Sequence, residues 1–466
     1  MSSESTELVS LNGTELQESQ LNYSSLRENI EPNDDSRNQE YITKNKDMLT
    51  DFQGFMLLLP TYIGIGFLGL PYMVKLLGLW YGSAGLLLFG ALNEIGVLML
   101  TGSVSRLTER TGERFSDFGR AAEMSMKLGP PCLQPHAGKF RLSIDLCIII
   151  PYGLFMPDLI AAMNLFLKDF LHQYIDINDA LSIIGISGLL LPIYMTRRMK
   201  LLSYLATIGN ITLFVIIIIS FQYICQDLPD TKMRPAAKLV DFLSFTSFVN
   251  DVMFSYGGIA LALPIRERMK STKHFDGWNG VLGLALMFVI SFHVGCGFFG
   301  YLKFGEITQV NYILNLPHDQ WIYKSLKMLS FLTLYFTIGT TVFIVTELVW
   351  GYLKDKFSME LIQNYGEYFC RFFLLIVSCA FTILVPELEL LISLTGCFGP
   401  VYLTLVVPMV ITLLTLYAEE EPSLLVKKLK RKVSIMCFVI LLIFGIYSMI
   451  AGFSVALYTA LYHIVL

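Results

Sequence analysis

Two clusters of glycine interrupt long apolar segments of this chain. The first consists of Gly64, Gly66 and Gly69, and the second lies in Ser255-Tyr256-Gly257-Gly258. Where a helix crosses lipid, an unwound stretch persists only if it is buried in protein or lines a cavity. The free N–H groups of such a break can bind an anionic group, and its free carbonyls a cationic one. The clusters therefore predict a binding site made largely of backbone.

Four ionisable side chains lie deep in apolar segments, namely Glu94, Asp158, Asp251 and His293. Ionisable groups inside a membrane are costly and are functional candidates by default. Asp251 lies within two turns of the second glycine cluster, and the alternative is a carboxylate that faces the outer vestibule near the membrane surface. Glu94 either titrates during function or holds two helices together. His293 has the ordinary pKa of a proton carrier, while a lone buried histidine is more often a hydrogen-bonded packing residue.

These groups belong to a chain of 466 residues that is 54% hydrophobic and 15% charged, with a mean hydropathy of +0.58. A soluble core cannot hide so much apolar surface, so we expect an all-α polytopic membrane protein. About twenty apolar residues cross a bilayer, and this criterion predicts eleven spans. They are 51–74, 79–103, 142–167, 180–196, 201–223, 241–264, 279–302, 323–351, 369–386, 388–416 and 433–462.

Lysine and arginine are concentrated in alternate connections between these spans, which predicts the orientation. The basic connections are 104–141, 197–200, 265–278, 352–371 and 417–432. We therefore expect a cytosolic N-terminus and an extracellular or lumenal C-terminus, in the plasma membrane or in a lysosomal or vacuolar membrane. The run Lys427 to Lys432 is most simply a topology anchor that contacts lipid headgroups.

Residues 1–50 differ from the rest, because they hold ten carboxylates against four basic side chains and are rich in polar residues. They predict a disordered acidic cytosolic tail, not a signal peptide, that precedes a transmembrane domain over 51–466. The remaining chain has no strongly basic surface, so no nucleic-acid binding is expected. The eight cysteines have neither disulfide nor metal spacing, so no metal or cofactor is expected.

The two glycine clusters fall in the first and sixth spans, five spans apart. Paired broken helices in two five-helix halves are typical of inverted-repeat transporters, which bind substrate at the midplane between them. Spans 1–5 and 6–10 would form the repeats, and span 11 would be an addition. The alternative interpretation is that glycine and proline are simply common in membrane helices, where they allow close packing or a kink.

The stretch from Gly64 to Tyr72, Gly-Ile-Gly-Phe-Leu-Gly-Leu-Pro-Tyr, resembles the "GTGxLGLPYA" opening of the amino acid/auxin permease family, closest to its proton-coupled amino acid transporter branch. Further similarities follow in the same order along the chain. They are Tyr256 to Pro264, Gly300 to Gly305, Leu314 to Pro317 and Pro386 to Gly396. The resemblance implies secondary active transport of amino acids on the eleven-helix, leucine-transporter-like fold of the APC superfamily, often coupled to protons.

Two positions depart from that branch. It usually carries a histidine in the first half of span 1, where this chain reads Met56-Leu57-Leu58-Leu59, and a glutamate at the position of Gly257. Both positions are apolar here. Proton coupling, where it occurs, would then depend on Asp251, Glu94 or His293.

An amino acid is a zwitterion, and unwound helices supply partners for both of its charges. Nine residues are the expected substrate contacts. They are Gly64, Gly66, Gly69, Tyr62, Ser255, Tyr256, Gly257, Gly258 and Thr337. The two tyrosines either close over the substrate or pack between helices, and Thr337 either lines the pocket or bonds its own backbone. The apolar residues around the breaks favour small neutral amino acids.

Three classes of function are open to a membrane protein with this sequence. A transporter that works by alternating access fits both the paired breaks and the resemblance. A sensor on the same fold, which binds an amino acid with little transport, is the alternative. An enzyme is not expected, because intramembrane catalysis needs positioned acid, base or metal groups, and motifs such as H-E-x-x-H and G-x-S-x-G are absent. The expected partners are the amino acid, protons if transport is coupled, and membrane lipids.

Overall fold

The computed structural model describes residues 48–64, 66–115, 117–171, 178–238, 242–317, 320–354, 360–385, 388–417 and 425–465. The chain divides into two units, Met1–Thr50 and Asp51–Leu466. The acidic tail predicted over 1–50 lies outside the described residues, except for residues 48–50.

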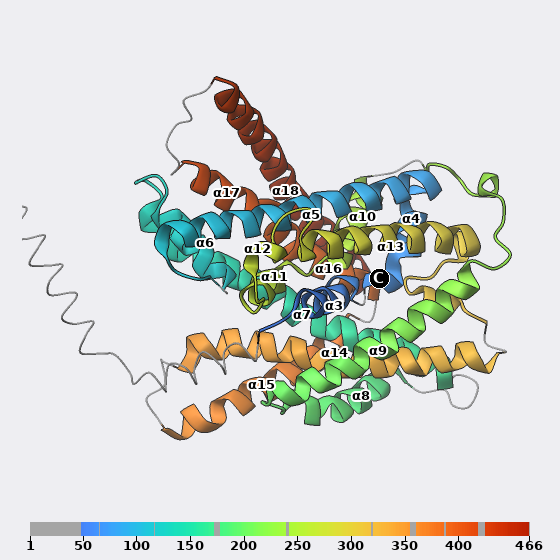
Figure 1. Ribbon diagram of the computed structural model, residues 1–466. Coiled ribbons are helices and arrows are strands. Elements are labelled where there is room, and N and C mark those ends of the chain that lie inside the picture. The colour runs from blue at the N-terminus through green and yellow to red at the C-terminus, as the bar shows by residue number, and fades with distance from the viewer. Residues whose placement is uncertain are drawn as a thin grey trace, which may run out of the picture. The chain divides into compact units, whose positions relative to one another are not determined.

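The regular elements of this second unit are helices, which Figure 1 draws from blue to red along the chain. The longer elements are α3 Asp51–Ile63, α4 Leu70–Leu77, α5 Leu79–Thr111, α6 Phe118–Lys127, α7 Ala137–Leu171, α8 Asp179–Tyr194, α9 Met199–Ile224, α10 Phe242–Ser255, α11 Ile259–Glu267, α13 Val281–Phe304, α14 Trp321–Leu353, α15 Glu360–Leu384, α16 Leu388–Phe398, α17 Val407–Tyr417 and α18 Leu425–Val465. Short elements join them, namely η1 Gly66–Gly69, η2 Gln134–His136, η3 Thr231–Met233, α12 Thr272–Phe275, η4 Gly305–Ile307, η5 Tyr312–Asn315 and η7 Tyr402–Val406.

Within the described residues, eight helices are long and apolar enough to cross a membrane, and the bent pair Asp51–Ile63 with Gly66–Leu77 would make a ninth. Two shorter apolar helices, Asp179–Tyr194 and Val439–Val455, coincide with the predicted fourth and eleventh spans. The chain is therefore a multi-pass membrane protein built from helices.

Several helices extend beyond the predicted spans. α5 continues to Thr111, α7 begins at Ala137 and α18 begins at Leu425. Hydropathy detects only the part of a helix that crosses lipid, whereas helical hydrogen bonding continues into the polar turns beyond it. A further difference is the π-helical turn Tyr402–Val406 between α16 and α17, where the sequence predicted an uninterrupted tenth span.

The helices of the second unit form two groups, which Figure 1 shows as neighbouring sets. In the first, α3, α4, α5, α10, α11 and α13 pack against one another. In the second, α7, α8, α14 and α15 do the same. α9 contacts α13 and α14, while the α16–α17 segment contacts α5 and α7. α18 packs on α10, α16 and α17.

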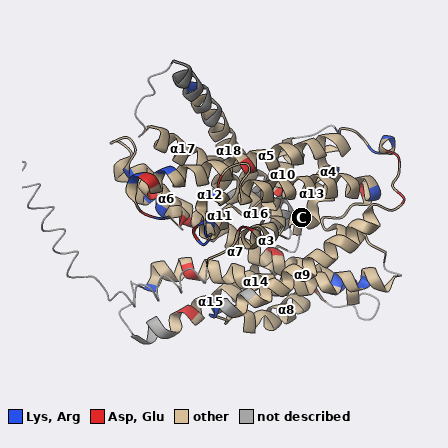
Figure 2. Cartoon of the chain, in the orientation of Figure 1, with Lys and Arg blue, Asp and Glu red and all other residues tan. Residues whose placement is uncertain are grey.

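Charged residues gather at the ends of these helices, whereas their middle parts are almost free of them in Figure 2. This distribution is the one expected for helices that cross lipid, since charge in the membrane centre is costly. The exceptions include Glu94, Asp158 and Asp251, all of which are buried.

The amphipathic helix α6 was not predicted, although its pattern is legible in the sequence. Phe118, Ala121, Ala122 and Met126 are buried, at the spacing of one helical face. The side chain of Asp117 caps the helix by accepting a hydrogen bond from the Gly119 N–H at 3.0 Å.

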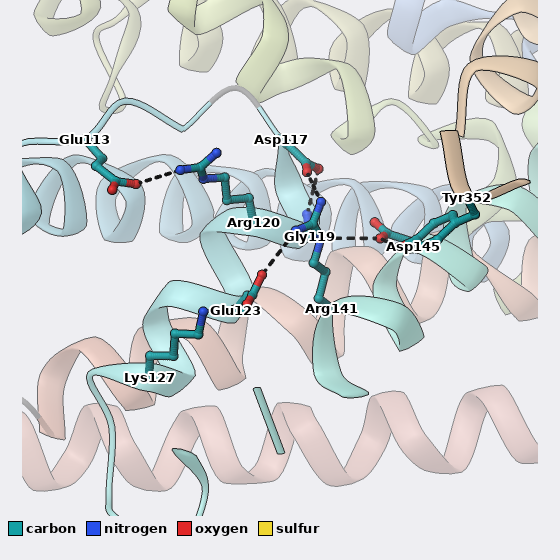
Figure 3. Close-up of polar contacts among 9 residues, drawn as sticks. All are labelled: Glu113, Asp117, Gly119, Arg120, Glu123, Lys127, Arg141, Asp145 and Tyr352. Carbon is teal, nitrogen blue, oxygen red and sulfur yellow. Dashed lines mark hydrogen bonds and ion pairs between the residues drawn. The ribbon is translucent and has the colours of Figure 1, made fainter. Parts of the chain in front are cut away.

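Charged side chains hold α6 against the first turns of α7 (Figure 3). Arg141 of α7 forms ion pairs with Glu123 at 3.2 Å and with Asp145 at 3.7 Å. A hydrogen bond from Lys127 holds the pKa of Glu123 below its usual range. Tyr352 of α14 donates to Asp145. α6 is thus tied to α7, and Asp145 of α7 is in turn bound to α14.

Candidate functional site

The first predicted break is present. α3 ends at Ile63, and Gly64 adopts a φ of +47°, a left-handed conformation that residues with a β-carbon rarely adopt. The chain then forms the 3₁₀ turn Gly66–Gly69 before α4 begins at Leu70. The two helical parts differ in direction by 45°. A backbone bend of this kind leaves N–H and C=O groups without helical partners.

The second predicted break is present at Tyr256 to Gly258. α10 ends at Ser255, and α11 begins at Ile259. The Gly257 N–H bonds the Phe254 carbonyl at 3.0 Å, which closes the end of α10 as a tighter turn. The last turn of one helix and the first turn of the next therefore meet here, with the positive dipole end of α11 at the break.

The two breaks touch each other, although about two hundred residues separate them. Gly66 packs against Ser255, so a β-carbon added at Gly66 would lie 2.8 Å from the Ser255 Cβ. Gly258 packs against the ring of Tyr62, where an added β-carbon would lie 2.8 Å from two ring carbons. At either position, any residue larger than glycine would overlap its neighbour.

The two tyrosines that flank the breaks behave differently. Tyr256 points away from the first break, because its hydroxyl donates to the Leu86 carbonyl at 3.2 Å and packs against Gly90. It therefore packs between α5 and α13. Tyr62 is also buried and lies on Gly258, and its hydroxyl has no hydrogen-bond partner within the described part of the chain.

A small cavity of about 20 Å³ lies beside the breaks. Its lining comes from the first break, from α4, α7, the last turn of α10, α16 and the segment before η5, namely Gly66, Leu68, Gly69, Met73, Ala162, Phe254, Val310, Asn311, Leu388 and Ile392. A cavity needs roughly 10–15 Å³ to hold one water molecule, so this one has space for about one. The cavity therefore admits no amino acid unless the elements around it move.

A second, larger cavity of about 380 Å³ adjoins the first, and we call it the vestibule. Its lining residues are Ala161, Asn164, Leu165, Lys168, Asp169, Asp179, Ile183, Gln309, Leu314 and Thr382. The two cavities are neighbours, because Ala161 lines the vestibule and Ala162 lines the small cavity. Likewise, Gln309 lines the vestibule and the next residue, Val310, lines the small cavity.

A buried arginine joins the C-terminal end of α11 to α5. Arg266 is only 4% exposed and donates to Asp276 through three hydrogen bonds of 2.8–3.1 Å. It also donates to the Ser105 hydroxyl at 2.6 Å. We call Arg266, Asp276 and Ser105 the ion-pair lock. Because α11 runs from the break to Glu267, the lock lies about two helical turns from the second break, at the far end of α11.

The structure brings some of the predicted ionisable groups to the breaks. His293 is fully buried, and its ring lies 4.8 Å from that of Tyr256. Its two nitrogens have no hydrogen-bond partner among the described residues. Asp251 is buried one turn before Ser255, and Glu94 is buried on α5 one turn after Gly90, which Tyr256 contacts.

Asp158 also lies near the small cavity, one helical turn before Ala162 on α7. It is fully buried beside Thr395 of α16. Thr337, by contrast, does not contact the breaks within the described part of the chain. Its hydroxyl donates to the Thr333 carbonyl at 2.8 Å, and it faces Gly209 of α9. The hydroxyl is satisfied by its own helix, as is common for threonine in membrane helices.

The geometry thus defines a multi-pass membrane protein in which two broken helices, far apart in the sequence, meet beside a small cavity. Residues 48–451 match the family model of the transmembrane amino acid transporter proteins, and the chain belongs to this family. The resemblance stated from the motifs is thereby confirmed. The family consists of transporters and not of enzymes.

Two relatives are similar along most of their length. The chain is 26% identical over 375 residues to the proton-coupled amino acid transporter-like protein pathetic of Drosophila melanogaster, a match that covers 79% of this chain and 78% of that protein. It is 22% identical over 427 residues to the probable amino acid transporter skat-1 of Caenorhabditis elegans, which covers 88% of this chain and 90% of that protein. Both names agree with amino acid transport.

Proposed function

We propose that this chain is a secondary active transporter that moves small neutral amino acids across a membrane by alternating access. The substrate binds between the two broken helices. The observation that carries this proposal is the contact of the breaks, in which Gly66 lies on Ser255 and Gly258 lies on Tyr62. Two unwound segments that meet inside a membrane protein are the arrangement that binds a substrate at the midplane.

In this proposal the backbone of the breaks recognises both charges of the zwitterion. The N-terminal turn of α11, which begins after Gly258, presents N–H groups and a positive dipole end to the carboxylate. The carbonyls at the ends of α3 and α10 accept hydrogen bonds from the ammonium group. Gly66 allows the two breaks to approach each other, Gly257 leaves room for the ligand backbone, and Tyr62 covers it. The apolar Phe67 and Leu68 suit a small uncharged side chain.

Eleven spans in two inverted repeats are supported by how the helices pair. The first two spans of one half, α3–α4 and α5, pack with α10–α11 and α13, their counterparts in the other half. The next pairs, α7 with α8 and α14 with α15, form the second group. α9 contacts α13 and α14, and its counterpart α16–α17 contacts α5 and α7. These contacts of one half thus have counterparts in the other half.

Alternating access requires that one end of the site be open while the other is closed. The vestibule and the ion-pair lock supply these two ends. With a cytosolic N-terminus, as the Lys and Arg distribution predicts, the vestibule faces the extracellular or lumenal side. The lock, together with the pair of His274 and Asp51 at 3.0 Å, closes the cytosolic side. The membrane is the plasma membrane or that of a lysosome or vacuole.

The substrate class and the coupling ion are tested together by a competition panel. Uptake of radiolabelled L-alanine into proteoliposomes that hold the full chain would be measured against unlabelled amino acids at outer pH 5.5 and 7.5. We expect glycine, serine and proline to compete, and arginine and glutamate to leave uptake unchanged. We also expect faster uptake at the lower pH. Competition by charged amino acids alone would overturn the substrate assignment.

Proton coupling, which the name of the Drosophila relative attributes to that protein, would here depend on Asp251 or Glu94. Asp251→Asn or Glu94→Gln is expected to remove the pH dependence of L-alanine uptake, because an amide of the same shape cannot carry the proton. The initial rate would be measured across an outer pH step, with His293→Gln as the third member of the series. The assignment to the two carboxylates is wrong if both single variants keep the pH dependence of the wild type.

A further inference from the structure

We propose that the vestibule is itself an amino acid binding site, separate from the site between the broken helices. In it, Lys168 binds the carboxylate of a neutral amino acid and Asp179 binds its ammonium group. This inference rests on the proposed function, since it concerns the same class of substrate. It adds a second binding event to the route.

The size of the vestibule fits this role. Its volume of about 380 Å³ lies in the range of roughly 300–1,000 Å³ that is typical of small-molecule pockets. The cavity beside the breaks holds about 20 Å³. In this conformation, therefore, the vestibule is large enough for an amino acid and the cavity at the breaks is not.

Two opposite charges stand together in the vestibule. The Lys168 ammonium lies 2.6 Å from the Asp179 carboxylate, and the two side chains are 35% and 55% exposed. Such a pair contributes only about 0–1 kcal/mol to stability. Opening it therefore costs little, and a zwitterion that enters gives each side chain a new counter-charge. A neutral amino acid has one group for each side chain of the pair. The extra charge of a cationic or anionic amino acid would have no counter-charge in this pair.

A nearly buried amide holds Asp179 in place. Asn164 is only 7% exposed, and its amide nitrogen donates to Asp179 at 3.2 Å. Its carbonyl oxygen accepts a hydrogen bond from the Ser182 hydroxyl. These contacts hold the Asp179 carboxylate from the α7 side through its Oδ1 atom. The Oδ2 atom of Asp179 has no partner among the described residues. The carboxylate is therefore positioned to accept from a ligand.

The other charged pair of the vestibule is already engaged. Asp169 forms an ion pair of 2.5 Å with Lys327, whose side chain is only 1% exposed on α14. Because that lysine is buried, removing its partner would be costly, and we assign the pair to structure. Leu165 and Leu314 provide apolar surface nearby, which suits an aliphatic side chain. The vestibule thus selects neutral aliphatic amino acids.

The position of the vestibule places this site on the route to the breaks. Ala161 and Ala162 are consecutive residues of α7 and line the two cavities in turn. An amino acid held by Lys168 and Asp179 is therefore adjacent to the central site before that site opens. Occupancy of the vestibule would raise the concentration of substrate at the breaks.

The test measures how many molecules of radiolabelled L-alanine bind to one full-length chain in lipid nanodiscs. We expect two in the wild type and one in either Lys168→Gln or Asp179→Asn. Gly66→Leu, which blocks the site at the breaks, is expected to keep one. In proteoliposomes, Lys168→Gln is expected to raise the half-saturating concentration of L-alanine about tenfold and to leave the maximal rate within twofold, because it weakens capture only.

Lys238→Gln is the matched control. Lys238 pairs with Glu306 at 2.9 Å at the same end of the helices but does not line the vestibule, so two molecules should still bind. One molecule per wild-type chain, with uptake unchanged in Lys168→Gln and Asp179→Asn, would overturn this inference and leave the proposed function intact. A wild-type chain that neither binds nor transports L-alanine or any other amino acid of the panel would overturn both.

Discussion

Replacing Gly66 with leucine is expected to abolish amino acid uptake, with a loss of at least about 100-fold in the initial rate. The added side chain would overlap the backbone of Ser255, so the two breaks could no longer approach each other. A displacement of about 1 Å at a binding site is enough for an effect of this size. The measurement is uptake of radiolabelled L-alanine per molecule of reconstituted protein.

Gly188→Leu is the matched control for this variant. Gly188 is an exposed helical glycine of α8, and a β-carbon added there meets no atom within 4 Å. Its uptake should stay within twofold of the wild type. Normal uptake by folded Gly66→Leu would contradict the placement of the substrate between the breaks.

The second large effect is expected when the ion-pair lock loses its carboxylate. Asp276→Asn removes the main counter-charge of the buried Arg266 guanidinium and leaves it only the pair with Glu267 at 2.9 Å. Breaking a buried pair in this way typically costs about 3–5 kcal/mol. We expect a fall of about 5 °C or more in the unfolding temperature and a loss of roughly tenfold or more in uptake, because the site would no longer close at the cytosolic end. Thermal unfolding in detergent and uptake in proteoliposomes check the two readouts.

Glu113→Gln provides the comparison for the lock. Glu113 pairs with Arg120 at 3.1 Å, but both side chains are about half exposed. An exposed pair contributes only about 0–1 kcal/mol, so this variant should unfold at nearly the wild-type temperature and transport normally. Equal behaviour of Asp276→Asn and Glu113→Gln would show that the lock has no role in closing the site.

The breaks could be located from the sequence because their cause is local. Glycine clusters inside an apolar segment have few structural explanations in a membrane, and the structure ends α3 at Ile63 and α10 at Ser255 as those clusters indicate. The pairing of the first and sixth spans followed from counting apolar runs. These conclusions needed no knowledge of which residues contact one another.

The contacts of the site could not be predicted in the same way. A helix that is apolar on all sides gives no periodic signal of which face it turns to a neighbour. The sequence therefore left open whether Tyr256 covers the substrate or packs between helices, and it could not show that Thr337 faces α9. The ion-pair lock joins Arg266 to Asp276, and both lie in a predicted connection between spans. Charged residues in such connections indicate the orientation of the spans but not which residues pair.

The vestibule was missed for a different reason. Lys168 and Asp179 lie at the ends of α7 and α8, where exposed charges are common and carry no signal of a site. Only the cavity between these helices and the segment around Gln309 gives the pair a function. The motif from Gly300 to Gly305, which resembles the family, stands just before that segment and was the nearest indication in the sequence.

The most direct test of the central claim is time-dependent uptake of radiolabelled L-alanine by proteoliposomes that contain the full chain, compared with equilibrium binding of the same ligand. Transport by alternating access predicts saturable accumulation inside the vesicles by the wild type and none by Gly66→Leu. Saturable binding by the wild type without accumulation would contradict the claim and identify the protein as an amino acid sensor.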